Sequence, residues 1–435
     1  MKRDLYQNLI NWKDDPYRKP LILKGARQVG KTYLLQQFAK QEYQKHVYLN
    51  FDLEPKLNDF FKDDLKPERL LRELSARAGT KIDTDTLLIF DEIQECPLAL
   101  NSLKYFQEMA PDIPLIAAGS LLGVKLTSPH SFPVGKVDFL ELKPLSFLEF
   151  LTALNQDMLR EFLNEHIPTN AISTPLHEQL IDYLKQYFIV GGMPEAVLNY
   201  VRDNDFNSVR KVQKNILEGY VSDFVKHAEP TDVMKIISVW NAIPSQLAKE
   251  NKKFKFSTIS GNARSREYEA SLQWLESAGM VYLSCRTATI KTPLDGYIEH
   301  NAFKIYMLDI GLLGCQSQLP IESVLQGDQL FIEFKGALTE NYVAQELIAQ
   351  GIDKLYYWFN ENRAEVDFIV QHNLQYLPLE VKSGTNIKSK SLTLYTDKYK
   401  PSLVLRTSLL NFKRDGALLN IPLYALANLK NYLVS

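Results

Sequence analysis

The segment "LILKGARQVGKTYLLQQFAK" constrains the fold of this 435-residue chain more than any other stretch. It contains the pattern Gly-x-x-x-x-Gly-Lys-Thr over Gly25–Thr32, after the apolar run Leu21–Leu23 and before a helical pattern over Tyr33–Phe38. Glycines in such a turn let backbone N–H groups surround phosphate oxygens, and the N-terminus of the next helix adds partial positive charge. The alternative is a chance glycine-rich turn, but a strand before it and a helix after it are the context that a phosphate-binding loop requires.

The loop predicts a nucleotide site with ATP and Mg²⁺ as cofactors. We expect Lys31 to reach the β- and γ-phosphates and the Thr32 hydroxyl to ligate Mg²⁺. The residues predicted to contact the nucleotide are Gly25, Ala26, Arg27, Gln28, Val29, Gly30, Lys31, Thr32, Asp91 and Ser120.

A second motif, "TLLIFDEIQ" over Thr86–Gln94, predicts the catalytic end of a buried strand. A continuous apolar run suits a central parallel strand, and open α/β sheets bind ligands at the carboxyl ends of their strands. We expect Asp91 to hold Mg²⁺ through water and Glu92 to polarise the attacking water, which favours hydrolysis over transfer to a small substrate. An Asp-Glu pair alone would also suit a solvated strand end; the upstream loop favours the catalytic interpretation.

Three further segments complete a predicted five-stranded parallel sheet with helices between its strands. They are His46–Asp52, Pro114–Ser120 and Lys136–Leu142. Ser120 ends one of them and is either a sensor of the γ-phosphate or an ordinary strand-to-loop turn.

Several motifs together resemble a large bacterial and archaeal group of AAA+-type ATPases whose members carry a C-terminal domain of unassigned function. They are "KGARQVGKTYLL", "FDEIQECP", "AAGSLLG", "ELKPLSFLEFL" and "GGMPEAV". The resemblance implies an ATPase, and because such cores often assemble in rings it also implies self-association. Members often have a Gly-Arg step where this chain has Gly135-Lys136. A lysine lacks the planar fork of arginine, which puts hydrolysis assisted by a neighbouring copy in doubt.

The middle of the chain predicts helices and then a winged-helix order. Helical patterns from about residue 145 to 228 suggest a lid over the nucleotide site. Between residues 232 and 290 the order is helix, short helix, helix and hairpin, in which Arg264 and Arg266 would meet phosphates. Glu267, Glu269 and Glu276 on the same helix would repel a nucleic acid, so a purely structural winged helix is the alternative.

Near the C-terminus, "AEVDFIVQHNLQYLPLEVKSG" predicts a β-hairpin with an Asp on one strand and Glu-x-Lys on the next. With the upstream helix that carries Glu340, this pattern resembles the restriction-endonuclease-like fold, whose motif would here be Glu340, Asp367, Glu380 and Lys382. Alternation places Glu380 and Lys382 on one face of their strand. Asp367 and Glu380 would bind Mg²⁺, and Lys382 would polarise the attacking water or neutralise the transition state.

Two interpretations of this hairpin stay open. Glu-x-Lys is also common on exposed strands, because opposite charges keep sheet edges soluble. The following "KSGTNIKSKSLTLYTDKYK" holds five lysines against one aspartate, a local basic patch that suits a phosphate backbone. The net charge of the whole chain is −2, so nucleic-acid binding would depend on such a patch.

The sequence therefore predicts a multidomain α/β protein. Its predicted parts are an AAA+-type P-loop core with a parallel sheet (1–145), a helical lid (146–230), a winged-helix-like region (231–320) and a restriction-endonuclease-like domain (321–435). Three widely spaced cysteines indicate reduced thiols in the cytoplasm, and no apolar run is long enough to span a membrane.

Three hypotheses for function follow. The first is a Mg²⁺-dependent ATPase that positions a DNA-processing, nuclease-like module. The second is an ATP-driven switch that binds DNA or a partner protein and cleaves nothing. The third treats the C-terminal domain as a scaffold for oligomer formation.

Overall fold

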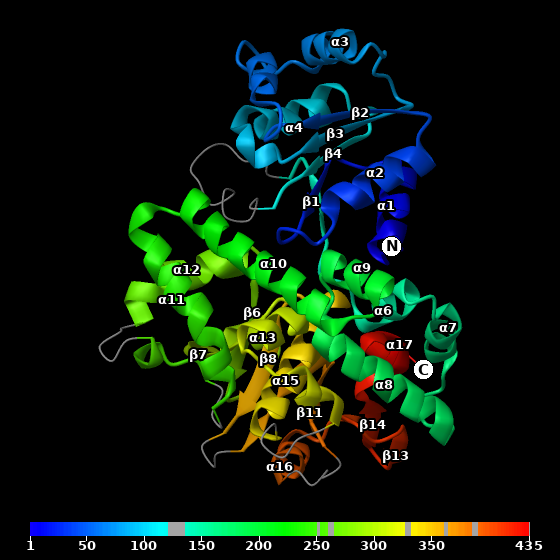
Figure 1. The fold of residues 1–435 in the computed structure, drawn as a ribbon, viewed down its shortest axis with the longest axis vertical. Helices are drawn as coiled ribbons and strands as arrows, with labels where there is room; N and C mark the ends of the chain where they lie inside the picture. The colour runs from blue at the N-terminus through cyan, green and yellow to red at the C-terminus, as the bar shows by residue number, and fades with distance from the viewer. Residues whose placement is uncertain are drawn as a thin grey trace. The chain divides into compact units, whose positions relative to one another are not determined.

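The computed structural model describes residues 1–120, 135–249, 253–259, 265–326, 332–360, 364–384 and 390–434. The chain divides into two compact units (Figure 1), Met1–Lys143 with Ser277–Gly279, and Pro144–Glu276 with Met280–Ser435. The predicted division into four domains stays a prediction. Among the described residues, no helix is both long and apolar enough to cross a membrane.

The first unit is built on a parallel five-stranded sheet in the order β2-β3-β4-β1-β5, which confirms the predicted central sheet. Its elements in chain order are α1 (Leu5–Asp14), β1 (Leu21–Lys24), α2 (Lys31–Glu42), β2 (Lys45–Asn50), η1 (Pro55–Phe61), α3 (Pro67–Ala78), β3 (Thr86–Asp91), η2 (Ile93–Glu95), α4 (Pro97–Met109), β4 (Leu115–Ala118) and β5 (Asp138–Glu141).

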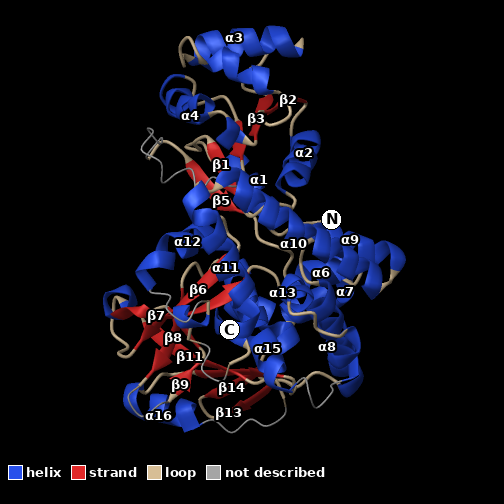
Figure 2. Ribbon diagram, turned by 60° about the vertical axis from the view of Figure 1, so that its left-hand side comes forward, coloured by secondary structure: helices blue, strands red, loops and turns tan. Residues whose placement is uncertain are grey.

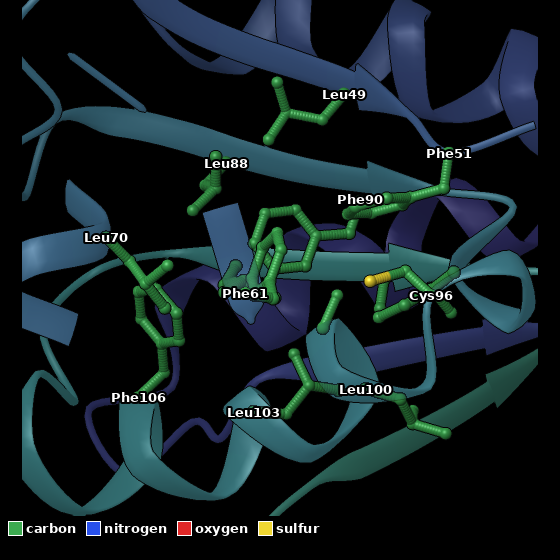
Figure 3. Packing of buried hydrophobic residues seen from close by; sticks show 14 of the residues in the cluster. Leu49, Phe51, Phe61, Leu70, Leu88, Phe90, Cys96, Leu100, Leu103 and Phe106 are labelled. Carbon is green, nitrogen blue, oxygen red and sulfur yellow. The ribbon is translucent and has the colours of Figure 1, made fainter. Parts of the chain in front are cut away.

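Every residue of β3 is buried, as its apolar sequence predicts. On one face of the sheet, Phe90 makes edge-on ring contacts with Phe51, Phe61 and Phe106, with ring centroids 5.6 to 6.3 Å apart (Figure 3). These rings bring η1 and α4 onto β3, and such aromatic pairs add stability beyond the apolar area that they bury. The buried core therefore fixes the strand whose carboxyl end carries Asp91.

The second unit begins with helices and continues as mixed α/β structure (Figure 2). Its helices are α6 (Phe147–Ala153), α7 (Asp157–Glu165), α8 (Thr174–Val190), α9 (Pro194–Asp203), α10 (Phe206–His227), α11 (Pro230–Leu247), η3 (Phe256–Thr258), α12 (Ser265–Ser277), η4 (Leu294–Tyr297), α13 (Ile310–Gln316), α14 (Ile321–Gln326), α15 (Ile332–Ala349), α16 (Lys390–Tyr399), η6 (Leu423–Asn428) and α17 (Leu429–Val434).

The residues of this unit that the structure describes form two sheets. One has the order β7-β6-β8-β9 and the other β10-β11-β12-β14-β13. Their strands are β6 (Val281–Thr287), β7 (Ile298–Met307), β8 (Leu355–Phe359), β9 (Glu365–Val366), β10 (Phe368–His372), β11 (Gln375–Val381), β12 (Val404–Ser408), β13 (Lys413–Asp415) and β14 (Leu418–Pro422). The predicted hairpin is the antiparallel pair of β10 and β11, and β11 then pairs with β12 in parallel.

The helices that were predicted to form a lid pack against later elements of their own unit. Helix α8 contacts α13, and α6 contacts η6. The Glu346 carboxylate on α15 accepts a hydrogen bond from the Phe147 backbone N–H at 2.9 Å. The helical segment is therefore integrated into the second unit, and its role as a lid stays a prediction.

The region that was predicted to be a winged helix has its elements in the predicted order: α11, η3, α12, and the antiparallel pair β6 and β7. Strand β6 also pairs in parallel with β8, so the hairpin continues into the sheet that contains β9. The sequence "FKIYMLDIGLL" over Phe303–Leu313 predicts a strand and a turn. The strand is present, but a helix follows it because the Asp309 side chain caps α13 by accepting the Leu312 N–H at 2.9 Å. Assignment of this region as a winged helix stays a prediction.

Candidate functional site

The predicted phosphate-binding loop lies between β1 and the first residue of α2. Gly25 and Gly30 have φ of +148° and +96°, which glycine adopts at little cost. A Cβ on Gly25 would also collide with the Leu142 carbonyl oxygen. Glycine thus stands at two loop positions with positive φ, and Gln28 adopts a third, with φ of +66°. Ala26 and Val29 of the loop are buried.

Lys31 is buried, and its ammonium donates hydrogen bonds to the backbone carbonyls of Gly25 and Ala26 at 2.9 and 2.8 Å. Burial lowers the pKa of Lys31 to about 8, and the carboxylates of Glu92 and Asp91 oppose this shift. The lysine that would meet the phosphates is therefore held by its own loop and loses its proton more readily than an ordinary lysine.

The two predicted ligands of Mg²⁺ lie side by side. The Thr32 hydroxyl donates a hydrogen bond to Asp91 Oδ2 at 2.7 Å, and the Tyr48 hydroxyl donates one to the same oxygen at 2.6 Å. Asn50 in turn donates to the Tyr48 hydroxyl at 3.1 Å. A hydroxyl and a carboxylate are the oxygen ligands that Mg²⁺ prefers, so these residues fit the ion.

Tyr48 was not predicted to belong to this site. It lies on β2, which pairs with β3 in register so that Tyr48 is opposite Ile89. Its segment was recognised as a strand, but the sequence alone gave no neighbouring strand for it. Only the order of the strands brings this hydroxyl to Asp91.

Glu92 follows β3 in a left-handed backbone conformation with φ of +50°, which is uncommon for a residue with a side chain. Its carboxylate accepts a hydrogen bond from the Gln94 side chain. Ser120 is buried just beyond β4, and β4 lies between β1 and β3. The sheet therefore brings the ends of three predicted site strands to one edge.

The Lys136 that replaces an expected arginine forms an ion pair with Glu108 of α4 at 3.1 Å. Both side chains are more than a third exposed, so this pair contributes little to stability.

Comparison with known proteins finds similarity over the segment that contains this site. A family model described as an AAA domain matches residues 17–151. This match covers most of the first unit. Two models described as domains of unknown function, DUF8612 and DUF4143, match residues 181–323 and 335–426. The comparison with curated proteins finds no match.

Solved structures with similarity to the chain include the Walker-type ATPase PABY2304 of Pyrococcus abyssi, with 16% identity and a TM-score of 0.46, over 72% of this chain and 95% of that one. They also include the Aeropyrum pernix ORC1 protein in complex with DNA, with 12% identity and a TM-score of 0.30, over 74% and 92% of the two chains. AMPPCP-bound DnaA from Aquifex aeolicus has 14% identity and a TM-score of 0.25, over 63% and 85%.

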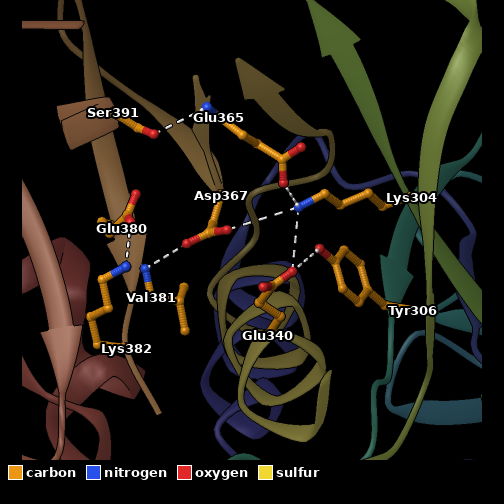
Figure 4. A network of polar contacts seen from close by, with 9 residues as sticks. All are labelled: Lys304, Tyr306, Glu340, Glu365, Asp367, Glu380, Val381, Lys382 and Ser391. Atoms are coloured by element: carbon orange, nitrogen blue, oxygen red, sulfur yellow. Dashed lines mark hydrogen bonds and ion pairs between the residues drawn. The ribbon is translucent and has the colours of Figure 1, made fainter. Parts of the chain in front are cut away.

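The predicted nuclease-like residues lie around β11 and α15 (Figure 4). Lys382 lies one residue beyond β11, and its ammonium is 2.7 Å from Glu380 Oε1, so the structure brings these two side chains together. Asp367 lies at a bend between β9 and β10 instead of within a strand. Its Oδ2 accepts a hydrogen bond from the Val381 N–H at 2.8 Å. The Asp367 side chain therefore bonds to β11 at the break between β9 and β10.

A lysine that was not predicted occupies the centre of this region. The ammonium of Lys304, on β7, lies 2.6 Å from Glu365 Oε1, 3.3 Å from Glu340 Oε2 and 3.9 Å from Asp367 Oδ1. Burial works against its charged form, but the carboxylates, Glu340 foremost, raise its pKa well above the ordinary value. The Tyr306 hydroxyl also donates to Glu340 Oε2, at 3.2 Å.

This arrangement does not fit a divalent ion as it stands, because an ammonium fills the space among the carboxylates. Among the described residues, no group of three or more His, Cys, Asp or Glu side chains is arranged to hold a metal. The metal-binding roles of Asp367 and Glu380 stay predictions.

The predicted nucleic-acid contacts are only partly described. Arg266 is exposed on α12, next to the exposed Glu267. Arg264 and Lys388 lie outside the described residues.

Proposed function

We propose that the AAA domain binds ATP with Mg²⁺ and hydrolyses it. The contact between Thr32 and Asp91, directly beyond the phosphate-binding loop, carries the proposal. Thr32 and Asp91 would hold the ion, which neutralises charge on the β- and γ-phosphates when bound. Lys31 would exchange its two loop carbonyls for phosphate oxygens, and Glu92 would orient and polarise the attacking water.

Steady-state ATP hydrolysis and binding of a fluorescent ATP analogue test this proposal together. Glu92→Gln is expected to retain binding and to lose roughly 100-fold or more in kcat, because a positioned general base contributes about that much. Lys31→Ala is expected to lose binding as well. Glu68→Gln, an exposed acid on α3, is the matched control and should behave as wild type. Hydrolysis that persists in Glu92→Gln would assign the water-activating role elsewhere.

We infer that the second unit serves as the output of an ATP-driven switch that binds DNA or a partner protein without cutting. Support comes from Lys304, whose ammonium pairs with Glu340 and Asp367, two of the carboxylates that a metal-dependent nuclease would use. DNA is the favoured partner because exposed lysines (Lys390, Lys398 and Lys400) follow β11. A cytoplasmic protein is proposed, consistent with its free cysteine thiols.

The second candidate function is DNA cleavage at the hairpin, which the contact between Glu380 and Lys382 favours. Supercoiled and single-stranded DNA incubated with Mg²⁺ or Mn²⁺, with and without ATP, distinguishes the two functions. Cutting by wild type, and not by the double variant Glu380→Ala, Lys382→Ala, would establish a nuclease. ATP hydrolysis with intact DNA, and DNA retention in a filter assay that weakens with salt, would support the switch.

Self-association of the AAA domain is also proposed, and the scaffold hypothesis requires it as well. Size-exclusion chromatography with light scattering, with and without ATP, measures it. A monomer under both conditions would contradict assembly.

A further inference from the structure

The carboxylates around Lys304 come from separate elements. Glu340 lies on α15, Glu365 on β9, and Asp367 at the bend before β10. In Figure 4 all three side chains point toward the Lys304 ammonium. Convergence of acids from several elements on one point is the arrangement that usually surrounds a hard cation.

The cation in this cluster is fixed in place. The Lys304 side chain is fully buried, and its ammonium also lies 5.0 Å from the ring centre of Tyr357 on β8. Its backbone is held because β7 pairs with β6, with Lys304 opposite Ser284. A buried charge is tolerated when it is paired and hydrogen-bonded. Here the Lys304 ammonium and the carboxylates around it satisfy that condition for one another.

A metal ion cannot join the cluster beside this lysine. Divalent ions bind carboxylate oxygens at about 2.0–2.6 Å, and their own charge would repel an ammonium at the same point. Three carboxylates face one ammonium, so the cluster favours a cation but already contains one.

We propose that Lys304 is a built-in cation that takes the place of a divalent metal, so that wild-type protein does not bind metal here. Glu340, Glu365 and Asp367 are not arranged to hold a metal as they lie around the ammonium, and removal of the lysine side chain lets them close around a divalent ion. The inference concerns only this cluster and does not depend on ATP hydrolysis.

Mn²⁺ binding by the full-length chain tests the proposal, measured by electron paramagnetic resonance of free Mn²⁺ and by thermal unfolding. An Asp91→Asn background removes the carboxylate of the two residues, Thr32 and Asp91, that are proposed to hold Mg²⁺ at the nucleotide site. In this background we expect no Mn²⁺ site at the cluster. Adding Lys304→Ala should lower Tm and create about one Mn²⁺ site per chain, with a Tm that rises as Mn²⁺ is added.

The matched control adds Asp367→Asn to Lys304→Ala and should lose the gained site. A second comparison keeps Lys304 unchanged. If the Asp91→Asn protein binds Mn²⁺ and adding Asp367→Asn abolishes that binding, the proposal is overturned. A folded Lys304→Ala protein without a Mn²⁺ site would overturn it too. DNA cutting by wild type would contradict the proposed switch, whereas Mn²⁺ bound at the cluster without cutting would contradict only this inference.

Discussion

The unusual acidity of Lys31 predicts that ATP binding takes up a proton. Without nucleotide, burial lowers the pKa of this lysine to about 8, so about half of the molecules lack its charge at pH 8. Phosphate oxygens favour the ammonium, and binding must therefore raise its pKa. The affinity for MgATP is therefore highest well below pH 8, where Lys31 is charged, and it falls as the pH rises above 8.

The size of the effect follows from the same pKa. We expect MgATP affinity to fall about tenfold between pH 7 and pH 9, equivalent to about 1.4 kcal/mol. Proton uptake on binding should be near zero at pH 7, about half a proton at pH 8 and close to one at pH 9.

Isothermal titration calorimetry in two buffers with different ionisation enthalpies measures this uptake. Lys31→Arg is the control, because a guanidinium stays charged throughout this pH range and should show no uptake from this position. A binding enthalpy that is equal in both buffers at pH 8, with an affinity unchanged from pH 7 to 9, would refute the argument.

Two further predictions concern hydrogen bonds. Tyr48→Phe removes a hydrogen-bond donor to Asp91. We expect the Mg²⁺ concentration that gives half-maximal ATP hydrolysis to rise roughly 10-fold, because the lost hydroxyl orients a metal ligand. Titration of ATPase activity with Mg²⁺ measures this concentration. Ser146→Ala removes the capping box of α6 and should cost about 1 kcal/mol in urea unfolding, whereas Ser173→Ala, at an N-cap without a side-chain bond, should cost less.

The phosphate-binding loop could be predicted because its requirements are local. Eight consecutive residues contain the glycines, the lysine and the threonine, and the flanking patterns supply a strand and a helix. The Asp91–Glu92 pair was equally recognisable, since an apolar run ending in acids is visible in one short segment. The sequence by itself therefore determined the parallel sheet and the candidate nucleotide residues.

Only the tertiary structure decided which distant side chains contact the predicted site residues. Tyr48 reaches Asp91 because β2 pairs with β3, and no local pattern specifies that neighbour. Lys304 reaches Glu340 across 36 residues, from a strand whose sequence predicted nothing more than a strand. Its burial among carboxylates changes the expected chemistry of the hairpin. The position of a charge in a folded chain depends on how helices and strands pack together, and the spacing of residues within a single element does not specify it.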